Sequence, residues 1–387
     1  MAVKVVRQLN KIALLGAPTS AAAMSLGHEG APAALRAAGL VERLGSIGYT
    51  VADLGDDPPR HFKPDEESPR ARNLPGILAA METLKPRVEQ AVKSSALPII
   101  LGGDCSIALA TVAGVRRYFR HVSMIYMDRD ADLNTPATTP SGCVDGMVVS
   151  HLTGRGAAEL VRFWGEPPLV REPDLALFGV ERLDPSEDEL LQRSTIRSYL
   201  ARDVQRMGAT AAAQTAVDRI HGNGYQFVLH FDVDVIADFR ATNYPGGGGL
   251  KLEEVRDALM VFVRQKHLAA MEVTAYNPAK DSDGSGAKLI IDLLTEVLAA
   301  RLQALNRTAD GNAPVPETSS AQPAEPAAAP IPTQEAGSTI LSTPQPGEAW
   351  SSDSLGSEND ADADESGSDN HNPDPSESSS ETDGSPS

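Results

Sequence analysis

The first 307 residues alternate short apolar runs with longer segments in which apolar residues recur at helical spacing. Several of the short runs are almost continuously apolar, which is typical of strands in a parallel sheet buried on both faces. The runs that we interpret as strands are Lys11–Leu15, Thr50–Asp53, Leu97–Leu101, Val122–Met127, Asp174–Phe178, Ile196–Leu200, Gln226–Phe231 and Leu268–Thr274. Helices are expected over Ala31–Leu44, Ile77–Val92, Ile107–Tyr118, Ala201–Ile220, Leu252–Gln265 and Ala287–Leu305. This alternation predicts an α/β domain with helices on both faces of one sheet.

Aspartates gather directly after two of the expected strands. In an open α/β sheet, ligands bind at the carboxyl ends of the strands, so these positions carry the candidate chemistry. If five carboxylates converge there, they require a compensating cation, and a divalent metal site is the usual solution. The alternative is that the aspartates form turns or are simply solvated. Two such clusters, each after an apolar strand, favour the cation site. The five residues are Asp128, Asp130, Asp132, Asp232 and Asp234.

Charge divides the chain into two parts. Of its 53 acidic residues, 16 lie between residues 308 and 387, where there is no Lys or Arg. The first 307 residues therefore carry 37 acidic and 34 basic side chains, close to neutrality within an overall net charge of −19. The last 80 residues hold 11 prolines and 16 serines and have almost no aliphatic runs. We predict a disordered acidic tail at 308–387 after a single domain at 1–307.

Composition also argues against several classes of protein. Neither part is basic enough to indicate a nucleic-acid partner. There is no apolar stretch long enough for a transmembrane helix, and the apolar run at 12–15 is too short for a signal peptide. Two cysteines in 387 residues give no disulfide framework. We therefore expect a cytoplasmic protein with no membrane or nucleic-acid partner.

Five ordered motifs resemble the arginase, agmatinase and formimidoylglutamase family, the ureohydrolases. The resemblance spans roughly residues 11–305. Gly102-Gly103-Asp104-Cys105-Ser106 is similar to the family's Gly-Gly-Asp-His-Ser, and Asp128–Thr135 resembles Asp-Ala-His-Ala-Asp-Leu-Asn-Thr. Thr139–Met147 resembles Thr-Ser-Gly-Asn-x-His-Gly-Met, Phe231–Asp234 matches Phe-Asp-Val-Asp, and Glu272–Pro278 is similar to Glu-Val-x-Glu-x-Asn-Pro. The fold that the resemblance implies is a three-layer αβα domain with an eight-stranded parallel sheet.

The resemblance implies metal-assisted hydrolysis. In the family, two Mn²⁺ ions bridge a hydroxide that attacks a guanidino or amidino carbon. Carried over by position, the retained aspartate ligands are Asp128, Asp132, Asp232 and Asp234. The substrate-binding positions are Asn134 and Ser141, with Cys143 beside them.

Four departures from the family pattern touch the chemistry. Cys105 and Asp130 stand where the family has His ligands, and Asp145 stands where it has the catalytic His. Ala275 replaces the Glu that faces the guanidinium. Thiolate is a softer ligand than imidazole and favours Zn²⁺, Fe or Cu. An Asp replaces a His in proton transfer only if burial raises its pKa. These changes weigh against ordinary arginine hydrolysis and leave one or two metal ions possible.

Four side chains have alternative interpretations: Arg129, Cys105, Cys143 and His230. Arg129, where the family has a small residue, either neutralises carboxylates inside the metal cavity or points from the opposite face of the strand. The two cysteines are either a redox pair or joint ligands of a soft metal, or, as we favour, small buried thiols without chemical consequence. His230 is isolated in the sequence, and we expect a core or surface role for it.

Two functional hypotheses follow. The first is a divergent metallohydrolase that acts on a C–N bond of a guanidino- or amidino-type small molecule, with Asp145 as the candidate acid or base. The second is a non-catalytic family member that binds a small ligand or regulates an active homologue. By resemblance to the family, we also expect a homo-oligomer, a trimer or a hexamer.

Overall fold

The computed structural model describes residues 8–221 and 225–309. Within them, eight parallel strands form one sheet in the order β2-β1-β3-β8-β7-β4-β5-β6. The strands are β1 Lys11–Ala17, β2 Thr50–Asp56, β3 Leu97–Gly102, β4 Val122–Met127, β5 Leu175–Val180, β6 Arg197–Leu200, β7 Gln226–Asp232 and β8 Leu268–Thr274. The eight strands and their parallel arrangement confirm the prediction, with differences of one to three residues at strand ends.

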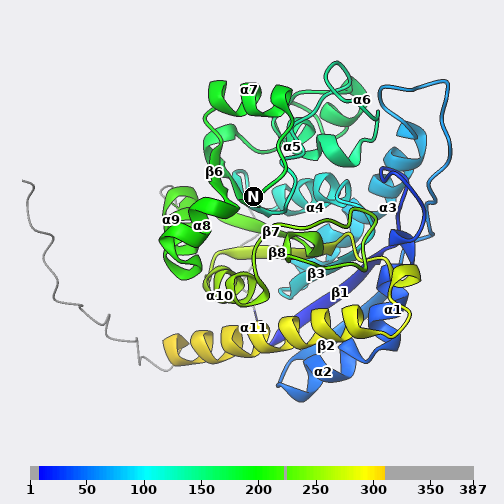
Figure 1. The fold of residues 1–387 in the computed structure, drawn as a ribbon. Coiled ribbons are helices and arrows are strands. Elements are labelled where there is room, and N and C mark those ends of the chain that lie inside the picture. The colour runs from blue at the N-terminus through cyan, green and yellow to red at the C-terminus, as the bar shows by residue number, and fades with distance from the viewer. Residues whose placement is uncertain (1–7, 222–224, 310–387) are drawn as a thin grey trace, which may run out of the picture. The chain divides into compact units, whose positions relative to one another are not determined.

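Helices cover both faces of this sheet (Figure 1). The helices are α1 Ala31–Ala37, α2 Leu40–Ser46, α3 Leu74–Lys93, α4 Ile107–Arg116, α5 Val148–Leu152, α6 Ala158–Val161, α7 Pro185–Arg193, α8 Ala201–Met207, α9 Ala209–His221, α10 Leu252–Val263 and α11 Ser285–Ala309. Short 3-10 helices lie at His28–Gly30, Asp145–Met147, Glu172–Asp174, Val233–Val235 and Pro278–Lys280.

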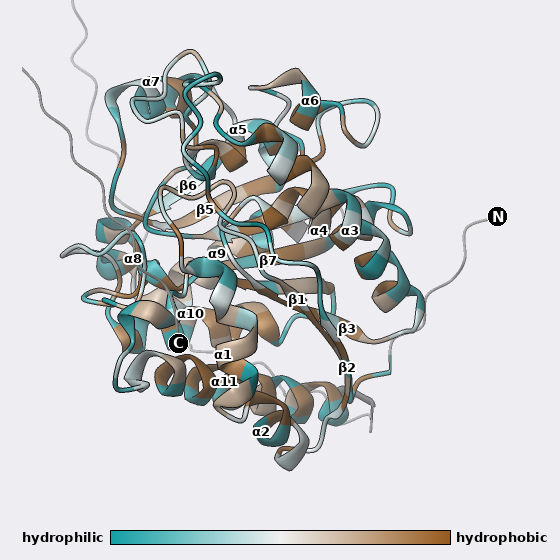
Figure 2. Ribbon diagram, turned by 90° about the vertical axis from the view of Figure 1, so that its right-hand side faces the viewer, coloured by the Kyte–Doolittle hydropathy of each residue, from teal (hydrophilic) through white to brown (hydrophobic). Residues whose placement is uncertain are grey.

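The core consists of two large apolar layers, one on each face of the sheet. One layer joins α1, α2, α8, α9, α10 and α11 to the sheet, and the other joins α3, α4, α5 and α6 to it. Within β4, Ile125 and Met127 belong to the first layer, whereas Met124 and Tyr126 belong to the second. Successive side chains in a strand point to opposite faces, so a strand between two helical layers must be apolar throughout. The predominantly brown strands in Figure 2 show this, and the architecture is the expected three-layer αβα.

Two of the expected helices are each divided in two. The segment at 31–44 breaks before Gly39, whose φ is 91°, and the segment at 201–220 breaks at Gly208, whose φ is 83°. Both values lie in the left-handed region, which glycine adopts without a steric penalty and which ends a right-handed helix. Helix α7 was missed because it is mostly polar. Its Leu190 and Leu191 only partly enter the core.

The predicted tail at 308–387 lies outside the described residues from 310 onward, so its disorder remains a prediction. Helix α11 ends at Ala309, two residues past the expected domain boundary. Among the described helices, none has the length and apolarity that crossing a membrane requires.

Candidate active site

A cavity of about 350 Å³ opens where β3, β4 and β7 end. Its walls come from the segments that follow these strands, from the loop at 139–146, from the segment at 182–187 and from Tyr244. Seven carboxyl groups line it, against a single guanidinium, that of Arg182. The acidic residues are Asp128, Asp130, Asp132, Asp145, Asp184, Glu187 and Asp232. Such a lining attracts cations, either metal ions or positively charged small molecules.

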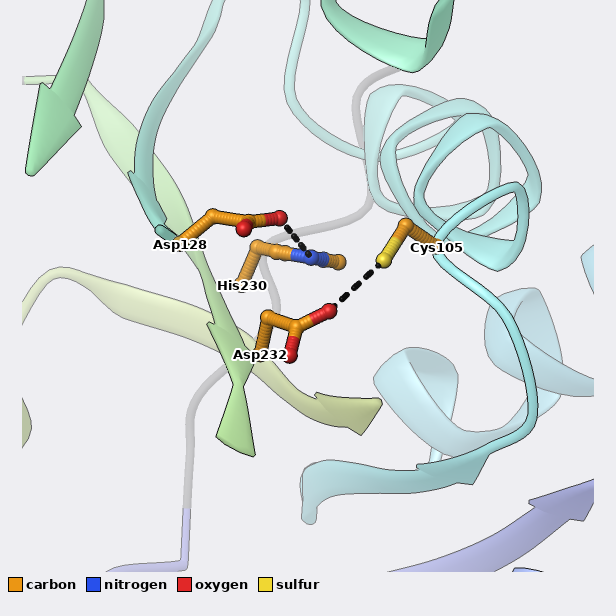
Figure 3. A group of neighbouring side chains, drawn as sticks. All are labelled: Cys105, Asp128, His230 and Asp232. Atoms are coloured by element: carbon orange, nitrogen blue, oxygen red, sulfur yellow. Dashed lines mark hydrogen bonds and ion pairs between the residues drawn. The ribbon is translucent and has the colours of Figure 1, made fainter. Parts of the chain in front are cut away.

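Four buried side chains lie together at this cavity, and we call them the Cys105 cluster: Cys105, Asp128 and Asp232, which line the cavity, and His230, which lies behind them. One donor atom from each lies within 4.8 Å of the others, and Figure 3 shows the four side chains converging. The Cys105 thiol donates to Asp232 Oδ2 at 3.0 Å. His230 Nε2 lies 4.0 Å from Asp128 Oδ2. The cluster therefore brings thiol, imidazole and carboxylate donors within reach of one ion.

Three neighbouring side chains fix the orientation of the His230 ring. Its Nδ1 lies 2.9 Å from Glu272 Oε1, and both side chains are fully buried. The ring stacks on Tyr126 with 4.0 Å between centroids and 3° between planes. Nε2 lies 3.3 Å from Thr274 Oγ1 and faces the cluster. The contact between Nδ1 and a carboxylate leaves Nε2 as the nitrogen available to a ligand.

Burial raises the pKa of the carboxyl groups at the cavity floor. Loss of hydration, together with repulsion among the acids, places the pKa of Asp128, Asp132 and Asp232 well above the usual value for aspartate. Asp132 also adopts φ 51°, a strained value for a non-glycine residue, and accepts a hydrogen bond from the Tyr126 hydroxyl. A bound cation would favour the ionised forms and remove this repulsion.

A second group of carboxylates adjoins the first, and we call it the Asp130 cluster: Asp128, Asp130 and Asp234. Arg182 Nη2 donates to Asp234 Oδ2 at 2.9 Å and also bonds Asp130 Oδ2. Arg129 Nη2 lies 3.3 Å from the same oxygen of Asp234. Two guanidinium groups therefore already neutralise part of this cluster.

Arg129 is fully buried, with 0% of its side chain exposed. Besides Asp234, its guanidinium bonds the backbone carbonyl of Tyr244 and, at 2.8 Å, that of Gly246. The sequence left open whether Arg129 neutralises carboxylates of the site or points away from the opposite face of the strand. In the structure its guanidinium pairs with Asp234, a carboxylate of the site. Arg129 reaches Asp234 without itself lining the cavity.

Asp145 faces the cavity with both carboxylate oxygens engaged. Oδ1 accepts from the Cys105 backbone N–H at 2.7 Å, and Oδ2 accepts from the Tyr244 hydroxyl at 2.6 Å. Burial raises the pKa of Asp145, although these hydrogen bonds oppose the shift. A raised pKa is the condition under which an aspartate at this position can exchange a proton near neutral pH.

The outer end of the cavity is polar. Asn134 donates to Asp184 Oδ2 at 2.9 Å and accepts from the Thr138 hydroxyl at 3.0 Å. Ser141 accepts from the backbone N–H of Cys143 at 3.1 Å. These groups offer hydrogen-bonding partners to the far end of an elongated ligand.

The structure brings nearly all of the predicted site residues to one cavity. Those that line it are Cys105, Asp128, Asp130, Asp132, Asn134, Ser141, Cys143, Asp145 and Asp232. Asp234 is buried behind the cavity in the Asp130 cluster, and its Oδ1 has no hydrogen-bond partner. The Cys143 thiol bonds the carbonyl of Ala22 at 2.8 Å and is not part of the Cys105 cluster. Geometry thus separates the two thiols that we considered as joint ligands.

Three side chains at or beside the cavity were not among the predicted site residues: Arg182 and Tyr244, which were not considered, and His230, for which we expected a core or surface role. His230 lies two residues before Asp232 on β7, so the two share a face of the sheet, and this spacing was the available signal. Arg182 and Tyr244 lie in loops, outside every motif, and no local pattern marks them.

Comparisons with known proteins agree with this geometry. A sequence profile described as the Arginase family matches residues 10–300. The chain belongs to the arginase family. It is 30% identical to an arginase of Bacillus subtilis over 294 residues, which cover 75% of this chain and 98% of that protein. It is 28% identical to an arginase of Bacillus caldovelox over 298 residues, covering 76% of this chain and all of that protein.

Solved structures show the same arginase-family fold. The crystal structure of arginase from Bacillus cereus superposes with a TM-score of 0.69 at 28% identity, covering 75% of this chain and 98% of that one. The formimidoylglutamase of Bacillus subtilis superposes with a TM-score of 0.60 at 18% identity, covering 76% and 88%, which is a likeness of fold alone.

Arginase-family enzymes depend on metal ions, so we ask whether the residues present suit one. The Cys105 cluster does, because four donor atoms of types that metals bind lie within 4.8 Å of one another. The buried Asp234 Oδ1 without a hydrogen-bond partner is a further free donor nearby. The Asp130 cluster suits a second ion less well, because Arg129 and Arg182 already bond its carboxylates.

Proposed function

We propose that this arginase-family protein binds a small guanidino- or amidino-type cation in its carboxylate-lined cavity and hydrolyses a C–N bond of that molecule. The observation that carries the proposal is the lining itself, with seven carboxyl groups and one guanidinium around about 350 Å³. A small molecule with a delocalised planar cation, such as a guanidinium group, can pair with several of these carboxylates at once. Ala275 offers no carboxylate, so the lining acids would have to pair with the substrate in its place.

The side chains would divide the work along the cavity. Asn134 and Ser141 would hydrogen-bond the end of the substrate that does not react, and Asp184 would accept from an ammonium group there. Asp145 would hold or return a proton at its carboxylate, oriented by the Tyr244 hydroxyl and the Cys105 N–H. The family's cofactor is a divalent ion, Mn²⁺ in the familiar members, and the candidate ligands are Cys105, Asp128, Asp130, Asp132, Asp232 and Asp234. The chemistry that such an ion supplies when bound is Lewis-acid activation of water.

The test is a substrate screen with the full chain. Guanidino, amidino and formimino compounds are added with Mn²⁺ or Zn²⁺, and release of urea or ammonia is measured beside calorimetric binding. We expect binding and turnover of at least one compound, with turnover reduced by about 100-fold or more in Asp145→Asn. Binding that survives in Asp145→Asn while turnover is lost would assign Asp145 to the chemistry. Absence of both binding and turnover would overturn the proposal.

A second candidate is a non-catalytic arginase-family protein that binds a ligand or regulates an active homologue. The observation that favours it is the Asp130 cluster, where Arg129 and Arg182 stand against the carboxylates. Binding without turnover in the same screen, with every metal, would support this candidate and exclude the hydrolase.

We also propose that the protein assembles as a trimer or hexamer and acts in the cytoplasm, in line with the family. Light scattering coupled to gel filtration gives the oligomeric state directly. A monomer at micromolar concentration would contradict the first part, and imaging of a tagged chain tests the second.

A further inference from the structure

The Cys105 cluster has a different chemical character from a set of carboxylates. It adds the thiol of Cys105 and the Nε2 atom of His230 to the oxygens of Asp128 and Asp232. Thiolate and imidazole are ligands that Zn²⁺ prefers, and together with the two carboxylates they give four donors, the number that zinc usually binds in proteins. Mn²⁺ and Mg²⁺ favour oxygen-rich sets.

The environment of His230 is that of a metal-binding imidazole. Glu272 Oε1 lies 2.9 Å from Nδ1, which fixes the ring and directs Nε2 into the cluster. A carboxylate behind a ligating histidine fixes its tautomer and increases its basicity. His230 lies on β7 and Glu272 lies on β8. Neither is one of the aspartates from which the sequence predicted a metal site.

Two arginine side chains already supply positive charge to the neighbouring Asp130 cluster. Arg129 and Arg182 both reach Asp234 Oδ2, and Arg182 also bonds Asp130. Of the three carboxylates, Asp130 and Asp234 bond a guanidinium and Asp128 does not, and Asp128 is the member shared with the Cys105 cluster. One divalent ion on the shared side would therefore complete the neutralisation.

We infer that this protein holds a single thiophilic divalent ion, Zn²⁺ in preference to Mn²⁺, on Cys105, His230, Asp232 and Asp128, with Arg129 and Arg182 in place of a second ion. The inference deepens the proposed function, because it rests on the same cavity and gives its cofactor. His230 acts as a ligand, and Glu272 is a positioning residue.

Binding of the ion is balanced by loss of a proton. The Cys105 S–H bond breaks, its proton leaves to solvent, and the sulfur forms a bond to Zn²⁺ without any change of oxidation state. The hydrogen bond from the thiol to Asp232 Oδ2 is lost at the same step, which frees that oxygen for the ion. Zinc binding should therefore release the thiol proton and one further proton from each ligand carboxyl group that is protonated in the metal-free protein, and calorimetry in buffers of different ionisation enthalpy counts them.

The test uses the full chain, stripped with a chelator and then reloaded. Elemental analysis after dialysis against Zn²⁺, Mn²⁺ or both gives stoichiometry and preference. We expect one Zn²⁺ per chain and a preference over Mn²⁺ of about 100-fold or more. Co²⁺ in place of Zn²⁺ should give a near-ultraviolet thiolate charge-transfer band, which reports the sulfur ligand without reference to activity.

Matched variants assign the ligands. Cys105→Ser should abolish the cobalt band, whereas Cys143→Ser, the other buried cysteine, should retain it. His230→Ala should weaken zinc binding, whereas His61→Ala should not, because 54% of the His61 side chain is exposed and it lies outside the cluster. Glu272→Gln should weaken zinc binding by about 10-fold and keep the cobalt band, since Glu272 acts through His230. Circular dichroism of each variant controls for folding.

Two ions per chain, a preference for Mn²⁺, or a cobalt band that survives in Cys105→Ser would each overturn the inference. So would the absence of any bound ion in the folded wild type. Calorimetric binding of guanidino compounds to the chelator-treated protein separates this failure from failure of the proposed cation-binding cavity.

Discussion

The Cys105 cluster and the Asp130 cluster adjoin at the same edge of the sheet and share Asp128, yet they deal with their negative charge differently. In the Asp130 cluster, two arginine side chains bond the carboxylates directly. In the Cys105 cluster, the contacts come from a thiol, an imidazole and backbone N–H groups, and the pKa of Asp128 and Asp232 is raised by burial. No guanidinium bonds Asp128 or Asp232 in the Cys105 cluster, so an added cation would have more negative charge to neutralise there than in the Asp130 cluster.

The two clusters keep the aspartates of the arginase-family motifs and differ in what surrounds them. These carboxylates are brought together by β4 and β7. In one cluster, guanidinium groups that are part of the chain bond the carboxylates. The other contains a thiol and an imidazole, which are donor types that suit a soft ion.

Replacing Arg129 with Met should have the largest effect. Removing a fully buried cation leaves Asp234 without one of its two partners and two backbone carbonyls without donors. We expect the free energy of unfolding, measured in urea, to fall by about 3–5 kcal/mol. If the arginine stands in for an ion, the variant should also take up more divalent metal than the wild type.

Arg256→Met is the matched control, because Arg256 pairs with Asp257 at the surface with 41% of its side chain exposed. Its effect should stay below about 0.5 kcal/mol. Equal losses in the two variants would contradict the role given to Arg129.

The Cys105 cluster should make stability depend on pH and on zinc. A carboxyl group with a raised pKa holds its proton more tightly in the folded state, so stability falls as pH rises toward the folded pKa. We expect the chelator-treated protein to lose stability as pH rises above about 4, the ordinary aspartate pKa, toward the raised pKa of Asp128, Asp132 and Asp232. Thermal unfolding across this range measures the slope.

Zinc should flatten that slope. At about 100 times its dissociation constant, a ligand of the folded state stabilises it by about 2.7 kcal/mol. Buried His28 and His151 oppose this loss of stability only below pH 6.5, because burial lowers their pKa to about 3 and about 4, so the slope above pH 6.5 reports the carboxyl groups without them. If zinc leaves the slope of stability against pH unchanged, the Cys105 cluster is not the source of the pH dependence.

Arg182→Met should have a smaller effect than Arg129→Met. Arg182 bonds Asp130 and Asp234, but 39% of its side chain is exposed, so solvent screens the pair. We expect a loss of about 1.5 kcal/mol in the same urea experiment. A loss as large as that of Arg129→Met would mean that exposure does not distinguish the two guanidinium groups.

Tyr244→Phe should have the smallest effect on stability. It should change the surroundings of Asp145 and leave those of Arg129 unchanged. The hydroxyl donates to Asp145, whereas the carbonyl that accepts from Arg129 belongs to the backbone and is retained. We expect about 1 kcal/mol of destabilisation and a further rise in the pKa of Asp145. The pH profile of turnover reports that rise, and an altered metal content would contradict the expectation that the surroundings of Arg129 are unchanged.

Almost continuous apolar runs located the central strands, because a strand between two helical layers is buried on both faces. The edge strands β2 and β6 carry polar and exposed residues and give a weaker signal. The breaks at Gly39 and Gly208 were harder to predict, since an isolated glycine within a helical pattern is often tolerated. Helix α7 was missed because its sequence carries few apolar residues, and its capping box of Asp184 and Glu187 is a local signal that apolar periodicity does not register.

The site divides in the same way. Cys105, Asp128 and Asp232 were found because they lie in motifs at the ends of strands, and Asp145 was found because the loop that contains it resembles a family motif. The side of the strand on which Arg129 lies could not be decided, because a turn follows β4 and resets the alternation of side chains. The partnership of His230 with Glu272 depends on β7 lying next to β8, a strand order that the sequence pattern does not encode.

The guanidinium of Arg129 is attached to the chain, so it cannot dissociate, be chelated or be outcompeted. The Asp130 cluster therefore acquires this positive charge during folding, whatever the supply of metal in the surroundings. A cell short of metal would still produce a folded domain with that part of the site complete. A shortage of the ion would empty only the neighbouring site that contains the thiol and the imidazole. The fraction of protein with metal bound would therefore follow a single binding equilibrium.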